Sequence, residues 1–174
     1  MVAAVLVVVC TVAPGVGWSQ APVCSYTVVN TYPHDDEAFT QGLLYSDGAL
    51  LESAGLWGES TLRRVVLETG QVVQSIDLHP GVFAEGLALW QDRLLQLTFQ
   101  QSTCFIWDAD TFAAIGTFAY AGQGWGLTHD GRRLIMSNGS SALTFRDPDT
   151  FAAIDSVVVT DAGAPGLDLS VWLP

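Results

Sequence analysis

The chain has 174 residues, 49% of them hydrophobic, which is enough for one domain with a sizeable core. Eighteen acidic residues stand against six arginines and no lysine, so the net charge is −12. Nucleic acids and anionic lipid surfaces both require cationic side chains, and the composition therefore argues against a nucleic-acid-binding protein and against peripheral membrane binding.

The chain begins with an apolar segment that is typical of an export signal. Residues 2–13 are nearly all apolar, and residues 15–21 offer small residues at a suitable cleavage position. The run is shorter than the roughly 20 residues of a membrane-spanning helix. No positive charge precedes it, and a buried strand or a disordered start is the alternative. We expect a signal peptide over residues 1–21, a mature domain over residues 22–174, a secreted or periplasmic location and no membrane attachment after cleavage.

Removal of the signal would leave two cysteines, Cys24 and Cys104. In an oxidising compartment they could form one disulfide, but the sequence gives no distance between them. Two independent buried thiols are the alternative.

One phrase occurs three times in the rest of the chain. The copies read Phe-Thr-Gln-Gly-Leu from residue 39, Phe-Ala-Glu-Gly-Leu from residue 83 and Gly-Trp-Gly-Leu from residue 124. Their aligned glycines, Gly42, Gly86 and Gly126, are 44 and 40 residues apart. A period of roughly 40 to 45 residues, filled with short strand-like runs and turn residues, is typical of a propeller blade of four antiparallel strands.

Each copy opens a block with the same order of strands and turns. Second strands are expected at residues 49–51, 94–97 and 134–136, third strands at 61–66, 103–107 and 142–145, and fourth strands at 72–78, 113–118 and 152–159. Turns containing Asp, Gly or Pro separate these runs, and β-branched or aromatic residues fill the fourth strands. No sustained helical period follows the apolar start. The sequence therefore predicts an all-β fold, a β-propeller with about three blades and a further stub.

The start of each block supplies the residues that would face a ligand. First strands line the central channel of a propeller, and here they carry Phe39 with Gln41, Phe83 with Glu85, and Trp125. A carboxylate among aromatic rings has a raised pKa because desolvation disfavours its charged form, so it can both give and accept a proton near neutral pH. Glu85 is the candidate catalytic group. The alternative is that it accepts backbone hydrogen bonds inside the blade.

Many ordered motifs of the chain together resemble one enzyme family. They are Tyr32-Pro33-His34-Asp35, Phe39-Thr40-Gln41-Gly42-Leu43, Glu85-Gly86-Leu87, Asp92-Arg93-Leu94, Leu97-Thr98, Gly124-Trp125-Gly126-Leu127-Thr128-His129-Asp130-Gly131 and Leu134-Ile135-Met136-Ser137. From about residue 26 to 160 the chain is similar to the plant and bacterial glutaminyl-peptide cyclotransferases, which are five-bladed propellers also called glutaminyl cyclases. The resemblance implies conversion of the N-terminal glutamine of peptide or protein substrates to pyroglutamate with release of ammonia, and it requires no metal or other cofactor.

The resemblance also implies roles for individual residues. Glu85 would act as general acid and base, Phe39 and Trp125 would shape an apolar pocket, and Gln41 would orient the substrate amide. Phe99 stands where the family usually has a tryptophan, so the aromatic face is kept and the indole N–H donor is lost.

The end of the chain departs from the family. Past the position of Thr160 the family has a segment containing Asn-Glu-Leu-Glu, then a tryptophan and a lysine that help line the pocket; residues 164–174 do not resemble it. The family's first strand, here residues 28–32, completes a last blade, and three blocks cannot close a five-blade ring. A truncation or a shifted reading frame would explain this ending. We expect exposed strand edges, poor solubility and impaired activity, and the alternative function is a non-catalytic propeller fragment that binds peptides or proteins.

Other polar groups give weaker signals. His34, His79 and His129 lie in separate loops without the spacing of metal ligands, so no metal site is predicted and turn or surface positions are expected. Glu52 and Glu59 are expected to be solvated.

Overall fold

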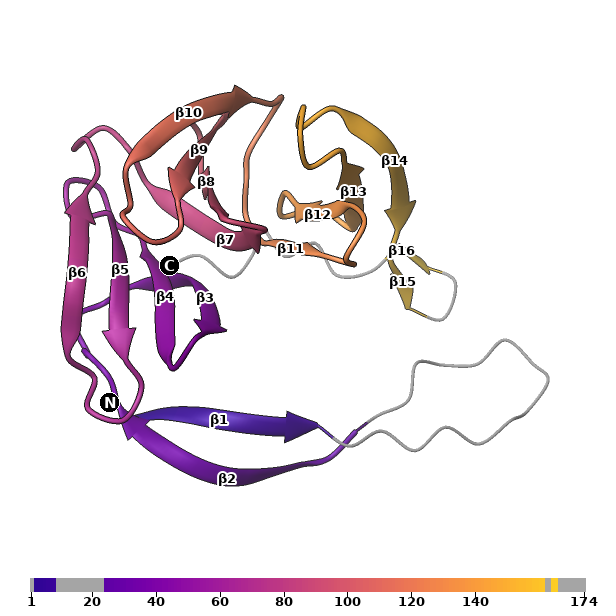
Figure 1. Ribbon diagram of the computed structural model, residues 1–174. Coiled ribbons are helices and arrows are strands. Elements are labelled where there is room, and N and C mark those ends of the chain that lie inside the picture. The colour runs from indigo at the N-terminus through magenta and orange to yellow at the C-terminus, as the bar shows by residue number, and fades with distance from the viewer. Residues whose placement is uncertain (1, 9–23, 162–163, 166–174) are drawn as a thin grey trace.

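The computed structural model describes residues 2–8, 24–161 and 164–165, and the regular elements in these ranges are all strands. Twelve of them form three antiparallel sheets of four strands each (Figure 1). The sheets contain, in chain order, β3(Thr40–Ser46), β4(Ala49–Ala54), β5(Thr61–Val66) and β6(Val72–Asp77); β7(Ala84–Trp90), β8(Arg93–Thr98), β9(Thr103–Asp108) and β10(Ala114–Ala119); β11(Leu127–His129), β12(Leu134–Ser137), β13(Ala142–Arg146) and β14(Ala153–Val158). The predicted all-β propeller with three four-stranded blades is confirmed. No helix long and apolar enough to cross a membrane occurs in the described ranges.

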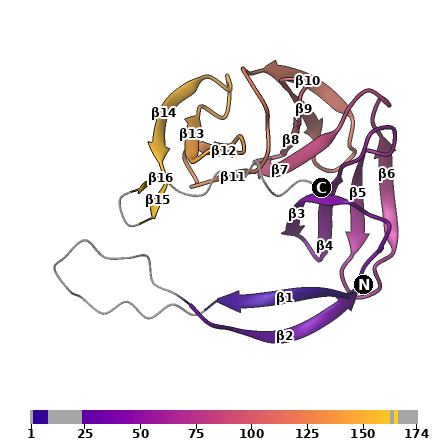
Figure 2. The ribbon, with the colours of Figure 1, turned by 180° about the vertical axis from the view of Figure 1, so that it is seen from behind.

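The three sheets follow one another around an arc, with β3, β7 and β11 on its inner side (Figure 2). Within each sheet the strands are hydrogen-bonded in chain order, from the inner strand outward. The second and third blades are joined directly, because the backbone N–H of Gly86 donates a hydrogen bond to the carbonyl oxygen of Trp125 at 2.7 Å. The predicted first strands are therefore the innermost ones.

The residues expected to form turns between the strands do form them. Asp47 and Gly48, between β3 and β4, have φ angles of 50° and 83°, as a two-residue hairpin turn requires. The turns between the third and fourth strands repeat one local motif. Oδ1 of Asp108 accepts hydrogen bonds from the backbone N–H and the hydroxyl of Thr111, at 2.8 and 2.6 Å, and Asp147 does the same with Thr150. Such side-chain bonds to a nearby backbone group fix turns.

Two apolar cores lie between neighbouring blades. The core of the first two blades contains Leu51, Leu62, Leu87, Leu94 and Phe112. The core of the second and third blades contains Ala88, Leu95, Leu97, Cys104, Ile106, Tyr120, Leu127, Leu134, Met136 and Phe151. The facing sides of neighbouring blades therefore cover each other, and this burial is the main stabilising term of the fold.

The repeated glycines stand where these blades touch backbone to backbone. A Cβ atom added at Gly42 would lie 2.6 Å from the backbone nitrogen of Leu87, and one added at Gly86 would lie 2.4 Å from the carbonyl oxygen of Trp125. A side chain at either position would push neighbouring inner strands apart. The period that reveals the propeller thus follows from the packing of one blade on the next.

The ends of the described chain form two further strand pairs. β1(Val2–Val8) pairs antiparallel with β2(Tyr26–Pro33), and β15(Thr160–Asp161) pairs with β16(Ala164–Pro165). Residues 28–32, expected to complete a last blade, lie within β2 and pair with β1 instead.

Two predictions on the N-terminal part have different outcomes. Most of the predicted signal peptide, residue 1 and residues 9–21, lies outside the described residues, so it stays a prediction. Cys104 is a free and fully buried thiol, so it forms no disulfide with Cys24.

Candidate functional site

The two polar side chains predicted for the channel both sit at β-bulges. In β3 the pairing with β4 shifts between Thr40 and Gly42, which leaves Gln41 as the extra residue. In β7 the pairing with β8 shifts between Ala84 and Leu87, around Glu85. A bulge bends its strand and re-aims a side chain, and bulges are frequent beside active sites. The same position of the repeat therefore presents a glutamine in the first blade and a glutamate in the second.

Glu85 is a buried carboxyl group. It is 4% exposed, and burial raises its pKa from 4.5 to about 8. In the described part of the chain, neither a hydrogen bond nor an ion pair compensates its carboxyl group. The alternative interpretation, that Glu85 accepts backbone hydrogen bonds within its blade, is thus not what the structure shows. Desolvation without a partner leaves the group largely protonated at neutral pH.

A row of aromatic rings crosses the three blades, and it includes Phe83, two residues before Glu85 in the chain. The ring centroids are 6.2 Å apart for Phe39 and Phe83, 5.9 Å for Phe83 and Phe99, and 6.1 Å for Phe99 and Trp125. Trp57, from the loop between β4 and β5, adds an edge contact to Phe83 at 5.7 Å. Three of the four predicted binding residues therefore belong to one row; Gln41 is half-buried at its bulge. Their roles in binding stay predictions.

Tyr120 lies close to this site although its sequence position gave no signal. Its hydroxyl donates to the carbonyl oxygen of Thr98 at 2.5 Å and accepts from the backbone N–H of the same residue at 3.1 Å. Burial raises the pKa of Tyr120, and the hydrogen bonds to Thr98 offset part of this rise. These hydrogen bonds fix the end of β10 against β8. Phe83, by contrast, could be found from the sequence because it repeats the position of Phe39.

A second polar cluster, in the first blade, surrounds Glu52. This side chain is fully buried; Arg63 donates to its Oε2 from Nη2 at 2.6 Å and from Nε at 3.2 Å. Its Oε1 accepts from the hydroxyl of Thr40 at 2.5 Å and contacts Nε2 of His34 at 3.0 Å. The prediction that Glu52 is solvated is wrong. Glu52 faces Arg63 directly across the pairing of β4 with β5, and this register is not readable from one strand alone.

The other histidines and Glu59 behave as expected. His79 and His129 each accept a hydrogen bond at Nδ1 from a backbone N–H two residues on, and Glu59 is exposed. His34 differs from its prediction as a turn or surface residue, because only 14% of its side chain is exposed and its ring contacts Glu52.

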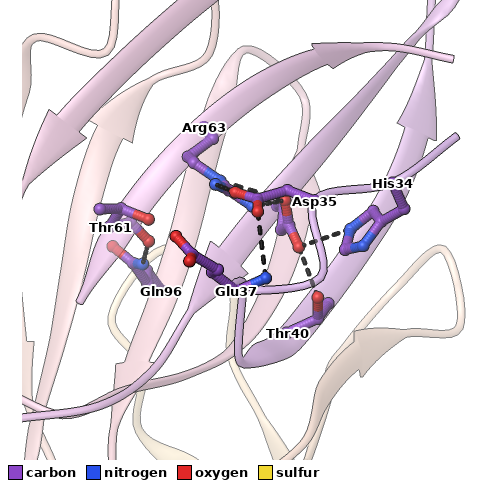
Figure 3. A network of polar contacts seen from close by, with 8 residues as sticks. His34, Asp35, Glu37, Thr40, Thr61, Arg63 and Gln96 are labelled. Atoms are coloured by element: carbon purple, nitrogen blue, oxygen red, sulfur yellow. Dashed lines mark hydrogen bonds and ion pairs between the residues drawn. The ribbon is translucent and has the colours of Figure 1, made fainter. Parts of the chain in front are cut away.

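The cluster around Glu52 carries charge at neutral pH. Asp35 accepts a hydrogen bond from Nη1 of Arg63 at 2.7 Å, and this bond holds the pKa of Asp35 below its ordinary value. Burial lowers the pKa of Arg63, but hydrogen bonds to Asp35 and Glu52 outweigh burial and raise it. Figure 3 shows His34, Asp35, Thr40 and Arg63 gathered at one point of the first blade.

Metal-ligating side chains do not gather in the part of the chain that the structure describes. No group of three or more His, Cys, Asp or Glu residues there is arranged to hold a metal ion.

The chain is similar to known proteins in sequence and in structure. Residues 1–170 match the protein family described as glutamine cyclotransferase. A glutaminyl-peptide cyclotransferase of Arabidopsis thaliana is 40% identical over 134 residues, which are 76% of this chain and 42% of that protein. The crystal structure of Myxococcus xanthus glutaminyl cyclase is 39% identical, with a TM-score of 0.73 over 80% of this chain and 59% of that one.

More distant structures share only the fold. The WD40 domain of Neurospora crassa Pan2 is 12% identical, with a TM-score of 0.60 over 75% of this chain and 40% of that chain. The chain thus spans about half the length of the cyclotransferases that it matches. On the family match and the identity to its relatives, the chain belongs to the glutamine cyclotransferase family.

Proposed function

We propose that this chain cyclises the N-terminal glutamine of peptides to pyroglutamate, with release of ammonia. The observation that carries the proposal is the carboxyl group of Glu85, which is buried, has no hydrogen-bond or ion-pair partner among the described residues, and has a pKa that burial raises to about 8. Family membership supports the same reaction, since the relatives from Arabidopsis thaliana and Myxococcus xanthus are named for it.

The reaction needs one group that moves protons in both directions. The α-amine of the substrate attacks the carbon of its own side-chain amide, a carbon–nitrogen bond to the ring forms, and the bond to the amide nitrogen breaks. The attacking nitrogen loses a proton and the departing nitrogen gains one, so no net proton is consumed. Glu85 gives its proton to the leaving nitrogen and recovers one from the attacking nitrogen. A carboxyl group with a pKa near the working pH is suited to both steps.

The aromatic row supplies the surroundings that this chemistry needs. Phe39, Phe99 and Trp125 offer apolar faces against which the methylene groups of a glutamine side chain can pack. Exclusion of water keeps Glu85 protonated. Packing against the rings holds the substrate folded back on itself, with its amine close to its side-chain amide. Holding two reacting groups together accounts for a large part of such rate enhancements. Gln41 orients the amide through its own amide group.

Ammonia release tests the proposal. The chain is incubated with a peptide that begins with glutamine, and ammonia is measured with a coupled enzyme assay while mass spectrometry follows the loss of 17 mass units from the peptide, about the mass of ammonia removed in closing the ring. We expect turnover in the wild type and a loss of roughly 10²-fold or more in Glu85→Gln. Glu68→Gln, at an exposed position in the turn between β5 and β6, is the control. Turnover that survives Glu85→Gln would remove Glu85 from the mechanism.

Peptide binding without turnover is the second candidate function. The row of Phe39, Phe83, Phe99 and Trp125 offers apolar faces to a peptide whether or not turnover follows. Under this function, peptides that begin with glutamine bind, and mutation of Phe39 or Trp125 weakens the binding, while no ammonia appears. Calorimetric titration beside the ammonia assay separates the two functions.

We also propose that the protein is exported, to the periplasm or out of the cell. The support is the apolar run at residues 2–13 followed by small residues, although the run includes β1. N-terminal sequencing of the protein recovered from outside the cytoplasm is expected to begin at Pro22. An intact N-terminus in a cytoplasmic fraction contradicts the proposal.

A further inference from the structure

The segment that leads into the candidate site is tied to one buried ion pair. Residues 34–41 run from the end of β2 to the bulge of β3 and carry Phe39 and Gln41. Three side chains of this segment bind Glu52 or Arg63. His34 and Thr40 contact Oε1 of Glu52 at 3.0 and 2.5 Å, and Asp35 accepts from Arg63 at 2.7 Å (Figure 3).

These three contacts, which we call the tethers, flank Phe39 in the chain and adjoin Gln41 on one side. Thr40 lies between Phe39 and Gln41 in the chain, so its hydroxyl fixes the backbone at the point where the two side chains diverge. The carbonyl oxygen of Phe39 accepts a hydrogen bond from Gly55 at 2.8 Å, while the ring of Phe39 is 36% exposed and meets Phe83 edge-on. The direction of the ring therefore depends on the backbone that carries it.

A small cavity lies against this segment. It has a volume of about 90 Å³ and lies among Asp35, Ala38, Phe39, Leu56 and Arg63. A well-filled interior would hold Phe39 by packing alone, but a hollow beside its ring does not. The tethers hold the segment in place where packing around Phe39 is incomplete.

We infer that Glu52 and Arg63 are positioning residues of the candidate site, which hold Phe39 and Gln41 in the orientation that a substrate beside Glu85 requires. The inference rests on the proposed function for its catalytic consequence. Stability alone does not account for the pair, because well-packed apolar residues of similar volume usually stabilise a buried site as well as an ion pair does. The ion pair fixes the path of residues 34–41 at three positions. His34 and Thr40 contact Glu52, and Asp35 accepts a hydrogen bond from Arg63.

Thr40→Val tests the inference with little risk to folding, because Thr40 is exposed and valine keeps the β-branched shape. We expect kcat/KM for a peptide that begins with glutamine to fall about tenfold or more, since misplaced contact groups far from the chemistry can cost that much. The pH profile set by Glu85 stays unchanged, and the thermal midpoint falls only by the few degrees that one lost hydrogen bond costs. Thr40→Ser keeps the hydroxyl and restores the rate. Thr128→Val, an exposed threonine of β11, is the matched control.

Limited digestion gives a readout that does not depend on turnover. A protease that cuts before aspartate is expected to cleave at Asp35 and Asp36 faster in Thr40→Val than in wild type, Thr40→Ser or Thr128→Val. If Thr40→Val is cleaved faster but the wild-type chain releases no ammonia, the proposed function is wrong, whereas the inference that Glu52 and Arg63 hold this segment in place stands. Equal kcat/KM in an active Thr40→Val protein, or equal cleavage in all four proteins, overturns the inference.

Discussion

Glu85 and Glu52 are both buried carboxyl groups, but their surroundings give them opposite properties. Glu52 has Arg63 on one oxygen and Thr40 with His34 on the other, so its position is fixed by hydrogen bonds. Glu85 has none of these partners among the described residues, and its pKa rises to about 8 because only burial acts on it. A carboxyl group without partners can change its protonation state without breaking any bond. This difference is the physical reason for assigning chemistry to Glu85 and support to Glu52.

The raised pKa of Glu85 makes the stability of the protein depend on pH. Between pH 4.5 and about 8 the unfolded chain has lost this proton while the folded chain keeps it, so the free energy of unfolding falls as pH rises. Below pH 4.5 the group is protonated in both states and has no effect. The loss is complete just above pH 8, with an upper limit on the order of 5 kcal/mol.

Thermal melts of wild type and Glu85→Gln between pH 4 and 9 measure this effect, because glutamine has the same shape and does not titrate. We expect equal midpoints at the acidic end and a midpoint several degrees higher for Glu85→Gln at the alkaline end. Glu59→Gln, at an exposed position, controls for the change in net charge. A difference between the two proteins that is constant over the range contradicts the buried, protonated state.

At the scale of elements, the contact between inner strands depends on glycine. In Gly86→Ala the new methyl group would lie 2.4 Å from the carbonyl oxygen of Trp125 and 2.5 Å from the backbone nitrogen of Leu127, both in the third blade. The hydrogen bond from Gly86 to Trp125 would have to lengthen. We expect a loss of about 2 to 4 kcal/mol in the free energy of unfolding, as for other overpacked sites, measured by urea denaturation.

Gly116→Ala is the matched control. Gly116 lies in β10, and a methyl group there meets only the side chain of Ile106, at 4.0 Å. Alanine in a strand costs less backbone entropy than glycine, so this variant is expected to be as stable as wild type or slightly more stable. Equal stability of Gly86→Ala and Gly116→Ala would mean that the inner strands can separate freely.

The sequence is sufficient to predict the elements but not the side-chain contacts between them. The 40-residue period and the turn residues predicted all twelve strands of the three blades, because strand length and turn chemistry are local properties. Glu52 and Arg63 are 11 residues apart on adjacent strands, and whether they face each other depends on the register of β4 and β5. Register is set by the hairpin as a whole, and a shift of one residue would send Glu52 to the opposite face. The same limit applies to Tyr120, whose contact with Thr98 joins two strands that are not neighbours in the sheet.

At the scale of the whole molecule, a sheet face is covered where it packs against a neighbouring blade. The opposite face of the first blade has no neighbouring blade among the described residues. Leu44 packs against the core between the first two blades, while Leu43 and Tyr45, on the opposite face of β3, are 46% and 65% exposed. A large apolar surface of this kind promotes association, and the net charge of −12 opposes it through repulsion. Salt screens that repulsion, so raising the ionic strength from about 0.01 M to 1 M, where the screening length falls from about 30 to 3 Å, should increase association.

Replacing Leu43 and Tyr45 together with threonine tests whether the open face of β3 drives this association. Threonine keeps the preference for strand structure and removes the apolar surface, so the variant is expected to shift toward monomer in light scattering after gel filtration, most clearly at high salt. Ile115 of β10 and Ile154 of β14, on the outer strands of the other two blades, are 55% and 54% exposed, and their double replacement with threonine is the matched control that leaves association unchanged. An equal shift in both variants would mean that exposed apolar area in general, rather than the face of β3, holds the copies together. A wild-type chain that stays monomeric at high salt and melts in one sharp cooperative transition would show that the arc of three blades is stable on its own, because nothing then needs to cover Leu43 and Tyr45.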